Sequence, residues 1–488
     1  SQTVPIRIRI NKTAMKNILI LCSDQMRGDA LGFMGNPVCR TPNFDRLAAR
    51  SVVFEQHLTT FPKCVPARAS LMTGRYTHTD GWRTVQQELD PQQPNLARSL
   101  RHQGYQTCVF GKNHCWSDED WQKMDYTSWS PEMIGIVKPK QPHEPINFDT
   151  EGLKPARLHE GWDYIGNGTR HRADEAYTDQ SIDFLAQRRD PKRPFFLQLN
   201  WESPHTKYGV EEPWFSMYDR DALPELPCSL PSNAPLAARA QREFRTGRED
   251  DPAAAREAPA TYYGMISKVD HLCGQILDTL DKLDLWKDTI VLFLSDHGDY
   301  AGQYGLPEKY DTHFPDCLMQ VPCTLCAPEL PAGKRVSSLC DIASLAPTLC
   351  ELLAIAPLPD MHGQSLLPVI AGEKNIDAVF ADGGHEEEMR QRYLELNRER
   401  IEANDPERGK PVAYWGSPDS MERAQMVRTQ HHKLVVRESG DNEFYDLESD
   451  PFEMRNLWGQ AEIQAHLPKL YQALARWNLR TLPEKPHL

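Results

Sequence analysis

The sequence has no apolar run long enough to cross a lipid bilayer, no internal repeat and no low-complexity tract. A membrane-spanning chain and a repeat architecture are therefore not expected. Basic residues are in deficit: 55 Lys and Arg stand against 69 Asp and Glu, a formal net charge of −14. So acidic a chain is not expected to bind nucleic acid, and it repels polyanions at long range. Any anion-binding site must be a local basic pocket.

Paired cysteine motifs are almost absent, although the chain has 12 cysteines. The cysteines are scattered, and several lie in apolar runs, as buried free thiols do. Their spacing does not indicate a disulfide framework. The one CxxC motif, Cys323 to Cys326, lies in a run that reads as a strand and has no second pair at zinc-ribbon spacing. We expect structural cysteines there rather than a metal or redox site.

No secretory signal peptide is visible in the printed sequence. Met15 looks like a natural start, so residues 1–14 are interpreted as an added leader. A cytoplasmic location is favoured on this ground, and a periplasmic or secreted one if a leader has been removed. The 488 residues suffice for a large domain over 15–375 and a smaller one over 376–488.

Four short apolar runs alternate with helical patterns along the chain. They are rich in β-branched and aromatic residues and bounded by turn residues, which is typical of buried strands. The alternation predicts an α/β fold with a large mixed, mostly parallel sheet sandwiched by helices. A strand pair with a turn at Gly440 and a terminal helix predict a C-terminal α+β subdomain with a short antiparallel sheet. The four runs are NILILCSDQ, TCVFGKNH, PFFLQLNWESPH and TIVLFLSDHG.

Each of these runs ends in residues that can do chemistry. Ligands of such sheets bind beyond the carboxyl ends of the strands, so we expect these residues to share one rim. Residues 118–175 and 206–258, with more Pro, charge and Trp and weak periodicity, are expected to form long insertions over that rim. The rim residues are Asp24, Lys112, His114, His205, Asp296 and His297.

The segment CVPAR, residues 64–68, is predicted to open a helix, because Pro66 fits its first turn and Gly74 its end. Cys64 would then lie where unpaired N–H groups and the helix dipole favour an anion and acidify a thiol. Arg68 could hold a tetrahedral oxyanion. The alternatives are a buried structural cysteine and a cysteine nucleophile. No local signature of a thiol protease is present, and the glycine-rich loop of a cysteine phosphatase is missing.

The motif CVPAR followed by ASLMTGRY closely resembles the signature of the sulfatase family, within the alkaline-phosphatase-like superfamily. Other segments resemble that family in the order in which its members carry them. The resemblance runs nearly end to end and implies an alkaline-phosphatase-like fold and hydrolysis of a sulfate monoester, with a carbohydrate or aryl alcohol as the expected leaving group. These segments are NILILCSDQMRGDALG, TPNFDRLAARSVVFEQHLTT, GYQTCVFGKNH, ESPH, SDHGDYAGQYGL and FYDLESDPFEMRNL.

The resemblance also implies a modified residue and a metal ion. In the family the motif cysteine is converted to formylglycine, an aldehyde, so a maturation enzyme is an expected partner of Cys64. One hydroxyl of the aldehyde hydrate attacks sulfur and the other expels sulfate, which avoids a stable ester. One divalent cation is implied: Ca²⁺ is expected, with Mn²⁺ or Mg²⁺ behind it. The ligands implied are Asp24, Gln25, Asp296, His297 and residue 64.

The family pattern assigns further roles. Lys112, His205 and Lys309 would bind sulfate oxygens, and His114 would serve as base for sulfate release. His205 is also a candidate for protonating the leaving alcohol. With Cys64 and Arg68, these residues form the catalytic set. Taken singly, each histidine or lysine could be structural, and Lys309 has no strong local pattern. Additional candidates for substrate contact are His385, His171, Arg172 and Trp201.

Two other functions stay open. Phosphonate monoester or phosphodiester hydrolases resemble this chain in scaffold, in signature, in the pair Asp24-Gln25 and in the pair Asp296-His297. They replace the Lys and His of GKNH by uncharged hydroxyl residues, which favours the sulfatase. An inactive relic that holds sulfated glycans would need a broken nucleophile or metal set, whereas Asp24, Cys64, Arg68, Lys112, His114, His205, Asp296 and His297 are all present. The metal set departs from the family pattern at two positions: Gln25 stands where Asp is common, and His297 stands where many members have Asn. The sequence does not indicate the sulfated position, exo or endo action, or the oligomeric state.

Overall fold

The computed structural model describes residues 8–10, 15–84, 87–90, 92–116, 165–168, 173–231, 233–243, 252–402 and 417–482. Its centre is a seven-stranded sheet of order β3-β5-β1-β7-β8-β2-β9. All neighbours are parallel except where β8 pairs with β7 and β2, so the sheet is mixed and mostly parallel, as predicted. The strands are β1 (Asn17–Asp24), β2 (Val52–Leu58), β3 (Gln106–Gly111), β5 (Phe195–Pro204), β7 (Thr289–Ser295), β8 (Cys323–Cys326) and β9 (Arg335–Asp341).

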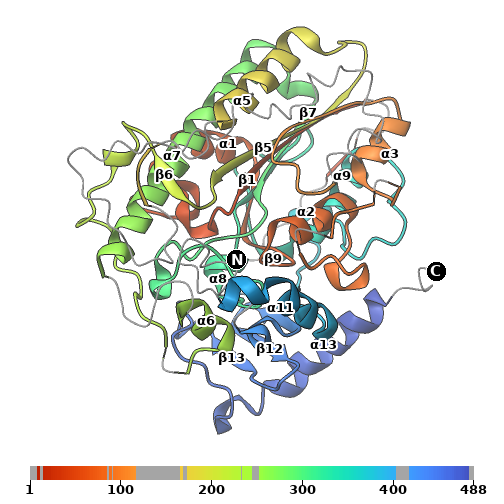
Figure 1. Ribbon diagram of the computed structural model, residues 1–488. Coiled ribbons are helices and arrows are strands. Elements are labelled where there is room, and N and C mark those ends of the chain that lie inside the picture. The colour runs from red at the N-terminus through yellow and green to blue at the C-terminus, as the bar shows by residue number, and fades with distance from the viewer. Residues whose placement is uncertain are drawn as a thin grey trace.

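Helices cover both faces of this sheet, and Figure 1 shows α1, α5 and α7 on one side and α2, α3 and α9 on the other. The strand β1 explains why two layers form. Ile18, Ile20 and Cys22 point into one apolar cluster, and Leu19 and Leu21 point into the other. A strand buried on both faces needs a continuous apolar run, which is the pattern seen in the sequence. The helices are α1 (Pro42–Arg50), α2 (Cys64–Thr73), α3 (Leu96–His102), α5 (Ala173–Asp183), α7 (Pro252–Lys282) and α9 (Leu345–Leu352).

The C-terminal part forms the predicted small antiparallel sheet, of order β10-β11-β12-β13. The helix α13 packs on it, with Trp477 stacked on Phe380 at 5.1 Å between ring centroids. Figure 1 shows this unit in blue beside the larger sheet. The division into two domains at residue 376 stays a prediction. The elements are β10 (Ala378–Gly383), β11 (Ala424–Thr429), β12 (His432–Arg437), β13 (Glu443–Asp446), α11 (Glu387–Glu402) and α13 (Leu467–Thr481).

The four predicted strands correspond to β1, β3, β5 and β7, which lie next to one another in the sheet and run parallel. The CxxC run is β8, and its cysteines are free thiols. Cys323 is buried in one apolar cluster and Cys326 packs against the other, so the prediction of structural cysteines is confirmed.

The insertion over 206–258 is more ordered than predicted. It holds β6 (Tyr208–Val210), which pairs with β4 (Ile165–Asn167), then α6 (Leu236–Gln241) and the start of α7. Pro259 lies inside α7. Proline is unfavourable in a helix interior, so the sequence did not predict that the helix begins before this residue. Two further short helices, α8 (Asp316–Met319) and α10 (Leu367–Ala371), lie later in the chain.

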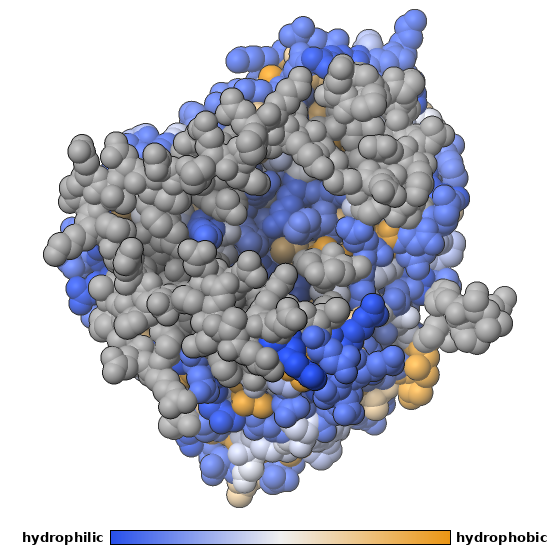
Figure 2. Space-filling view, in the orientation of Figure 1, coloured by the Kyte–Doolittle hydropathy of each residue, from blue (hydrophilic) through white to orange (hydrophobic). Residues whose placement is uncertain are grey.

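The surface shown in Figure 2 is hollowed near its centre, and the described residues visible inside the hollow are mainly hydrophilic. Across the described ranges, none of the helices combines the length and the apolar character required to span a bilayer.

Candidate active site

The helix α2 places Cys64 at the carboxyl edge of the large sheet. The helix begins at Cys64 and is closed by Gly74, whose φ of 70° is the left-handed conformation that ends helices. Cys64 Sγ lies 3.2 Å from His297 Nε2 and 3.7 Å from Asp24 Oδ1, with 2% of the residue exposed. Burial alone would raise the pKa of this thiol, but the charges of Lys112, Lys309 and His297 bring it well below the ordinary value.

Arg68 lies one helical turn after Cys64 and faces the same region. Its Nε donates to Asp296 Oδ2 at 2.8 Å, its Nη2 to Asp24 Oδ2 at 3.1 Å, and its Nη1 to the Lys112 carbonyl at 2.9 Å. The sequence predicted that Arg68 holds an oxyanion. In the structure this guanidinium pairs with two carboxylates, because β1 and β7 bring both acids to the same edge, and its contact with an oxyanion stays a prediction.

Lys112 and His114 follow β3 on a tightly held loop. Lys112 Nζ lies 2.7 Å from Asp24 Oδ2. The preceding Gly111 has a φ of 93°, and a Cβ there would lie 1.9 Å from the Asn200 carbonyl oxygen, so only glycine fits. His114 itself has a φ of 48°, a conformation that costs a non-glycine residue on the order of 1–3 kcal/mol. A hydrogen bond from His114 helps to lower the pKa of the Cys64 thiol.

His205 and Lys309 contact each other, with His205 Nε2 2.9 Å from Lys309 Nζ. The other ring nitrogen, Nδ1, lies 2.6 Å from the Thr206 carbonyl. An ammonium can only donate and a carbonyl can only accept, so this arrangement fits a neutral imidazole that carries its proton on Nδ1. Burial and the charges of Lys112 and Lys309 lower the pKa of His205 to about 3. Within this pair, Lys309 therefore holds the extra proton.

Four buried groups form a set that could hold a metal ion, and their ligand atoms all lie within 4.8 Å of one another. His297 Nδ1 lies 2.9 Å from the Gly298 carbonyl, which leaves the Nε2 lone pair directed into the set. Two carboxylates, an imidazole and residue 64 are chemically suitable for a divalent cation. The residues present therefore fit the metal that the sequence predicts. The set is Asp24, Cys64, Asp296 and His297.

Asp24 and His297 are tuned by their surroundings. Burial raises the pKa of Asp24, but the positive charges of Lys112 and Arg68 outweigh burial and hold that pKa well below its usual range. Burial lowers the pKa of His297, and the Asp296 carboxylate more than reverses this shift. The Asp24 carboxyl is thus held in its ionised form, as a metal ligand must be.

Gln25 lies beside the set in a left-handed conformation, with a φ of 70°. Its backbone N–H donates to Asp296 Oδ1 at 3.0 Å. Its side-chain Oε1 accepts from Lys309 Nζ at 2.6 Å, and its Nε2 donates to Asp299. The assignment of Gln25 as a metal ligand stays a prediction.

The predicted substrate contacts fare differently. Trp201 is a correction: it is 0% exposed, packs in the apolar cluster under α7, and donates its indole N–H to Thr178 Oγ1 at 2.9 Å. It belongs to the core because it points inward from β5. His385 is buried with Nε2 3.6 Å from Asp311 Oδ2, and its contact with substrate stays a prediction. His171 and Arg172 lie outside the described residues.

Sequence reasoning missed several residues that support the site. Asp299 and Glu308 are buried beside Gln25 and Lys309, and Tyr208 reaches Asp299 from β6. Lys63 pairs with the buried Asp311 next to the start of α2. Asp299 could have been found from the second acid of SDHGD. Tyr208 carries no local signal, because it reaches the site only through the folding of an insertion.

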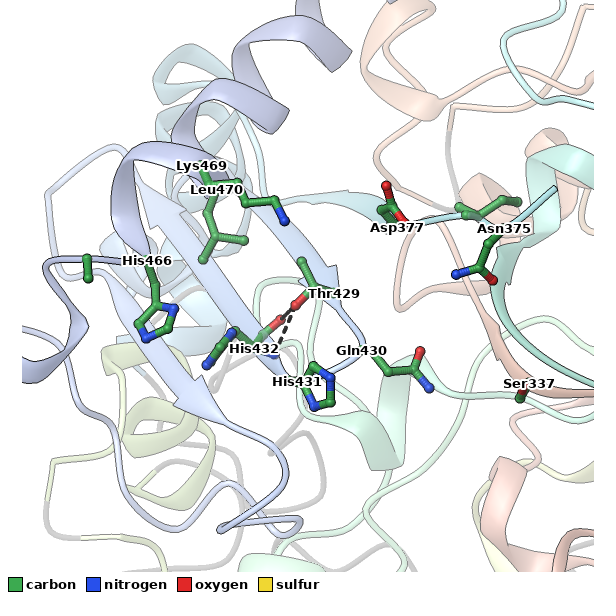
Figure 3. Close-up of a pocket in the computed structure, with 12 residues that line it drawn as sticks. Ser337, Asn375, Asp377, Thr429, Gln430, His431, His432, His466, Lys469 and Leu470 are labelled. Carbon is green, nitrogen blue, oxygen red and sulfur yellow. Dashed lines mark hydrogen bonds between the residues drawn. The ribbon is translucent and has the colours of Figure 1, made fainter. Parts of the chain in front are cut away.

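A separate polar cavity of about 570 Å³ lies between the edge strand β9, the turn joining β11 to β12, and the start of α13 (Figure 3). His432 and His466 lie side by side there (Figure 3). Their ring centroids are 4.2 Å apart. None of the predicted site residues lines this cavity.

Several known proteins are similar to this chain in sequence. The family model "Sulfatase" matches residues 16–355. An arylsulfatase of Clostridium perfringens strain 13 is 26% identical, over 94% of both chains. The multifunctional alkaline phosphatase superfamily protein PehA of Trinickia caryophylli is 25% identical, over 95% of both chains.

Solved structures agree on the fold. The phosphonate monoester hydrolase of Agrobacterium radiobacter superposes with a TM-score of 0.72 at 22% identity, over 96% of both chains. BT4656, solved in complex with its substrate D-glucosamine-2-N,6-O-disulfate, superposes with a TM-score of 0.71 at 20% identity, over 96% of this chain and 98% of that one. The predicted α/β architecture is therefore confirmed as the alkaline-phosphatase-like fold of these enzymes.

Proposed function

The chain belongs to the sulfatase family and is a sulfuric ester hydrolase, and we propose that it cleaves the sulfate monoester of a carbohydrate or aryl alcohol through residue 64 and one divalent cation. The observation that carries this proposal is the grouping of Cys64 with Asp24, Asp296 and His297 within 4.8 Å. The proposed nucleophile precursor and the three proposed metal ligands lie together at one sheet edge, where such folds bind their ligands. They come from three segments: Asp24 from β1, Cys64 from α2, and Asp296 and His297 from the end of β7.

We propose that Cys64 is converted to formylglycine by a maturation enzyme. The aldehyde hydrate would supply a hydroxyl nucleophile and a second hydroxyl that lets sulfate leave. The chain itself offers that residue an anion-favouring helix N-terminus and the positive charges of Lys112 and Lys309. These features would stabilise negative charge on any nucleophile at position 64.

Asp24, Asp296 and His297 would hold the cation, with Gln25 as an added oxygen ligand. The cation would supply Lewis acidity and neutralise charge on the sulfate. We propose Ca²⁺, because oxygen ligands dominate the set. Mn²⁺ and Mg²⁺ are the alternatives. Of these two, the imidazole of His297 favours Mn²⁺, which is the softer ion. Elemental analysis of purified protein would identify the ion.

The remaining side chains would bind sulfate and move protons. The ammonium groups of Lys112 and Lys309 both act electrostatically on residue 64, which suits the oxygens of a tetrahedral dianion. His114 contacts Cys64 and would act as the base that releases sulfate. Because His205 is neutral and accepts from Lys309, we propose that the leaving alcohol receives its proton from the Lys309–His205 pair.

A sulfated sugar is the proposed substrate class. A related N-acetylglucosamine-6-O-sulfatase of Bacteroides thetaiotaomicron is 23% identical over 95% of this chain, and BT4656 was solved with a sulfated glucosamine. The net charge of −14 disfavours attack inside a highly sulfated polymer. We therefore propose a small or terminal sulfate group rather than an internal one.

The competing function is hydrolysis of phosphonate monoesters or phosphodiesters. Two features favour it: the presence of Gln25 after Asp24 and of His297 after Asp296, as the resemblance to those hydrolases implies, and the superposition on a phosphonate monoester hydrolase. Against it stands Lys112, whose ammonium is fixed on Asp24 at 2.7 Å, whereas those enzymes carry uncharged hydroxyl residues in its place.

One experiment decides between these functions. Purified, matured protein is assayed side by side with a panel of sulfated mono- and disaccharides, an aryl sulfate, a phosphonate monoester and a phosphodiester. A sulfate ester should give the highest kcat/KM, and a dominant phosphonate rate would refute the proposal. The mass of the peptide that contains residue 64 should be lower by about 18 Da, as expected when formylglycine replaces cysteine. An unmodified peptide in the natural host would favour an inactive glycan-binding protein.

A further inference from the structure

We infer that Asp299 is a positioning residue that fixes the side-chain amide of Gln25 with its oxygen, rather than its nitrogen, directed toward Lys309 and the metal-binding set. The inference rests on the proposed function, because it assigns a role within the same site. It concerns a feature peculiar to a glutamine at this position. The two oxygens of a carboxylate are equivalent acceptors, whereas an amide has one acceptor oxygen and one donor nitrogen, so its orientation matters.

The contacts of Gln25 define its orientation. Nε2 donates to Asp299 Oδ2, and Oε1 accepts from Lys309 Nζ at 2.6 Å. An ammonium has no acceptor and a carboxylate no donor, so only one orientation of the amide satisfies both neighbours. All three side chains are buried, at 0% exposure for Gln25 and Asp299 and 3% for Lys309. Water therefore cannot substitute for a lost partner at low cost.

Asp299 is itself held in place by two donors. Its Oδ1 accepts from Ala301 N at 2.6 Å and from the Tyr208 hydroxyl. Its backbone N–H donates to the Cys317 carbonyl at 3.0 Å. A Cβ at the neighbouring Gly298 would lie 2.0 Å from that same carbonyl oxygen, so the glycine allows this close approach. The carboxylate is thus fixed before it meets Gln25, as a residue that orients a ligand should be.

The orientation of Gln25 controls two functional groups. Lys309 Nζ contacts Gln25 Oε1 and His205 Nε2, so the amide oxygen sets the position of the ammonium that would bind sulfate. The same oxygen is the only atom of the side chain that could serve as a ligand for a hard cation. A flipped amide would place an N–H₂ group against an ammonium and remove that oxygen.

The variant Asp299→Asn tests the inference because it forces this flip. The Ala301 N–H is a fixed donor, so the new amide must turn its oxygen toward Ala301 and its nitrogen toward Gln25. Gln25 can then keep a hydrogen bond only by reversing its own amide. We expect the affinity for Mn²⁺ or Ca²⁺, measured by calorimetry, to fall about 10–100-fold. At saturating metal, kcat/KM for a sulfate ester should fall at least about tenfold.

The double variant Gln25→Glu/Asp299→Asn supplies the rescue. A carboxylate at position 25 can accept from the new amide and from Lys309 at the same time. We expect the metal affinity to return to within a few-fold of the wild-type value. A purely structural role of Asp299 predicts no such recovery.

Two further variants guard against a trivial result. Asp270→Asn removes an equally buried carboxylate that accepts from Asn43 and Phe44 on α1, away from the metal set, and should leave the metal affinity unchanged. Tyr208→Phe removes one donor to Asp299 and should give a smaller loss of metal affinity than Asp299→Asn. It serves as the test if Asp299→Asn does not fold.

The possible outcomes distinguish a failure of the proposed function from a failure of the role assigned to Asp299. A wild-type protein that binds no metal and hydrolyses no sulfate ester would remove the proposed function. A wild-type protein that does both, beside an Asp299→Asn variant of equal metal affinity or a double variant without recovery, would overturn the role of Asp299 alone.

Discussion

Arg68 Nη2 lies 3.1 Å from Asp24 Oδ2, and both side chains are completely buried. The Nε of the same guanidinium lies 2.8 Å from Asp296 Oδ2. One arginine thus neutralises two acids that parallel strands bring to the same sheet edge. In the folded protein it is a permanent counter-ion for these acids, whether or not a metal ion is bound.

Replacement of Arg68 by methionine should therefore destabilise the protein by about 3–5 kcal/mol, the usual cost of leaving a buried charge without its partner. A divalent cation should return part of this loss, because it would neutralise the same carboxylates. Urea denaturation with metal and with chelator measures both effects. Equal metal-induced stabilisation of the variant and the wild type would contradict this role.

Removal of metal from the wild-type protein should abolish hydrolysis and lower stability. At a free metal concentration about 100 times Kd, the bound ion contributes about 2.7 kcal/mol to the free energy of unfolding. Thermal unfolding before and after dialysis against a chelator measures the change, and re-addition of metal should restore it. An unchanged melting temperature would contradict a metal held by Asp24, Asp296 and His297.

Lys112→Met should reduce kcat/KM for a sulfate ester by about 10²–10³-fold, because the variant loses the charge that we propose binds the sulfate oxygens. Its selectivity should shift toward phosphonate monoesters relative to the wild type, since those enzymes carry uncharged residues at this place. Steady-state assays on both substrates measure the ratio. Lys192→Met, at an exposed site whose backbone N–H donates to Asp190, is the matched control and should change neither rate.

Lys63→Met should weaken the protein in a pH-dependent way through Asp311. Burial raises the pKa of this carboxyl, but Lys63 and a hydrogen bond from His385 lower it to about 2, against an ordinary 3.8. A depressed acid pKa stabilises the fold above pH 4, and this contribution is lost as the pH falls through about 2. The variant should therefore be less stable by about 2 kcal/mol at pH 7 and by less at pH 3.

Chemical denaturation of Lys63→Met and of the wild type at several pH values measures this difference. Lys63→Arg keeps the charge and should behave as the wild type does. A gap that widens toward low pH would show that Asp311 is not the linked group.

Trp201→Phe should cost about 1–3 kcal/mol of stability, because it leaves a small void and removes the hydrogen bond to Thr178. It should leave KM for any sulfate ester unchanged. A selective rise in KM at unchanged stability would restore Trp201 to the substrate-binding residues.

The sequence was sufficient for the sheet and for the rim of the site. Period and length identified β1, β3, β5 and β7, and the parallel arrangement followed from their alternation with helices. The reversed strand β8 could not be predicted, because a four-residue apolar run carries no sign of its direction. Cys323 and Cys326 look the same on a parallel and on an antiparallel strand.

Side-chain partners were harder to predict than positions. Arg68 was placed correctly on α2, but its pairing with Asp24 and Asp296 depends on distances between separate segments, which a sequence pattern does not contain. The direction of the Trp201 side chain could not be predicted either. Trp201 stands three residues before the end of β5, and successive side chains of a strand point to opposite faces of the sheet. A shift of one residue in the strand would turn this side chain from the core to the opposite face. Tyr208 reaches Asp299 through an insertion that has no regular pattern.

Cys64 is only 2% exposed, and it is enclosed by side chains from several segments of the chain. An enzyme that oxidises this residue could not reach it in the finished fold. The proposed conversion would then have to occur during synthesis, before α2 docks on the sheet. Activity would therefore depend on whether the modifying enzyme acts before the chain folds. Protein purified with an intact thiol would stay inert, and later exposure to the modifying enzyme would activate it only after unfolding.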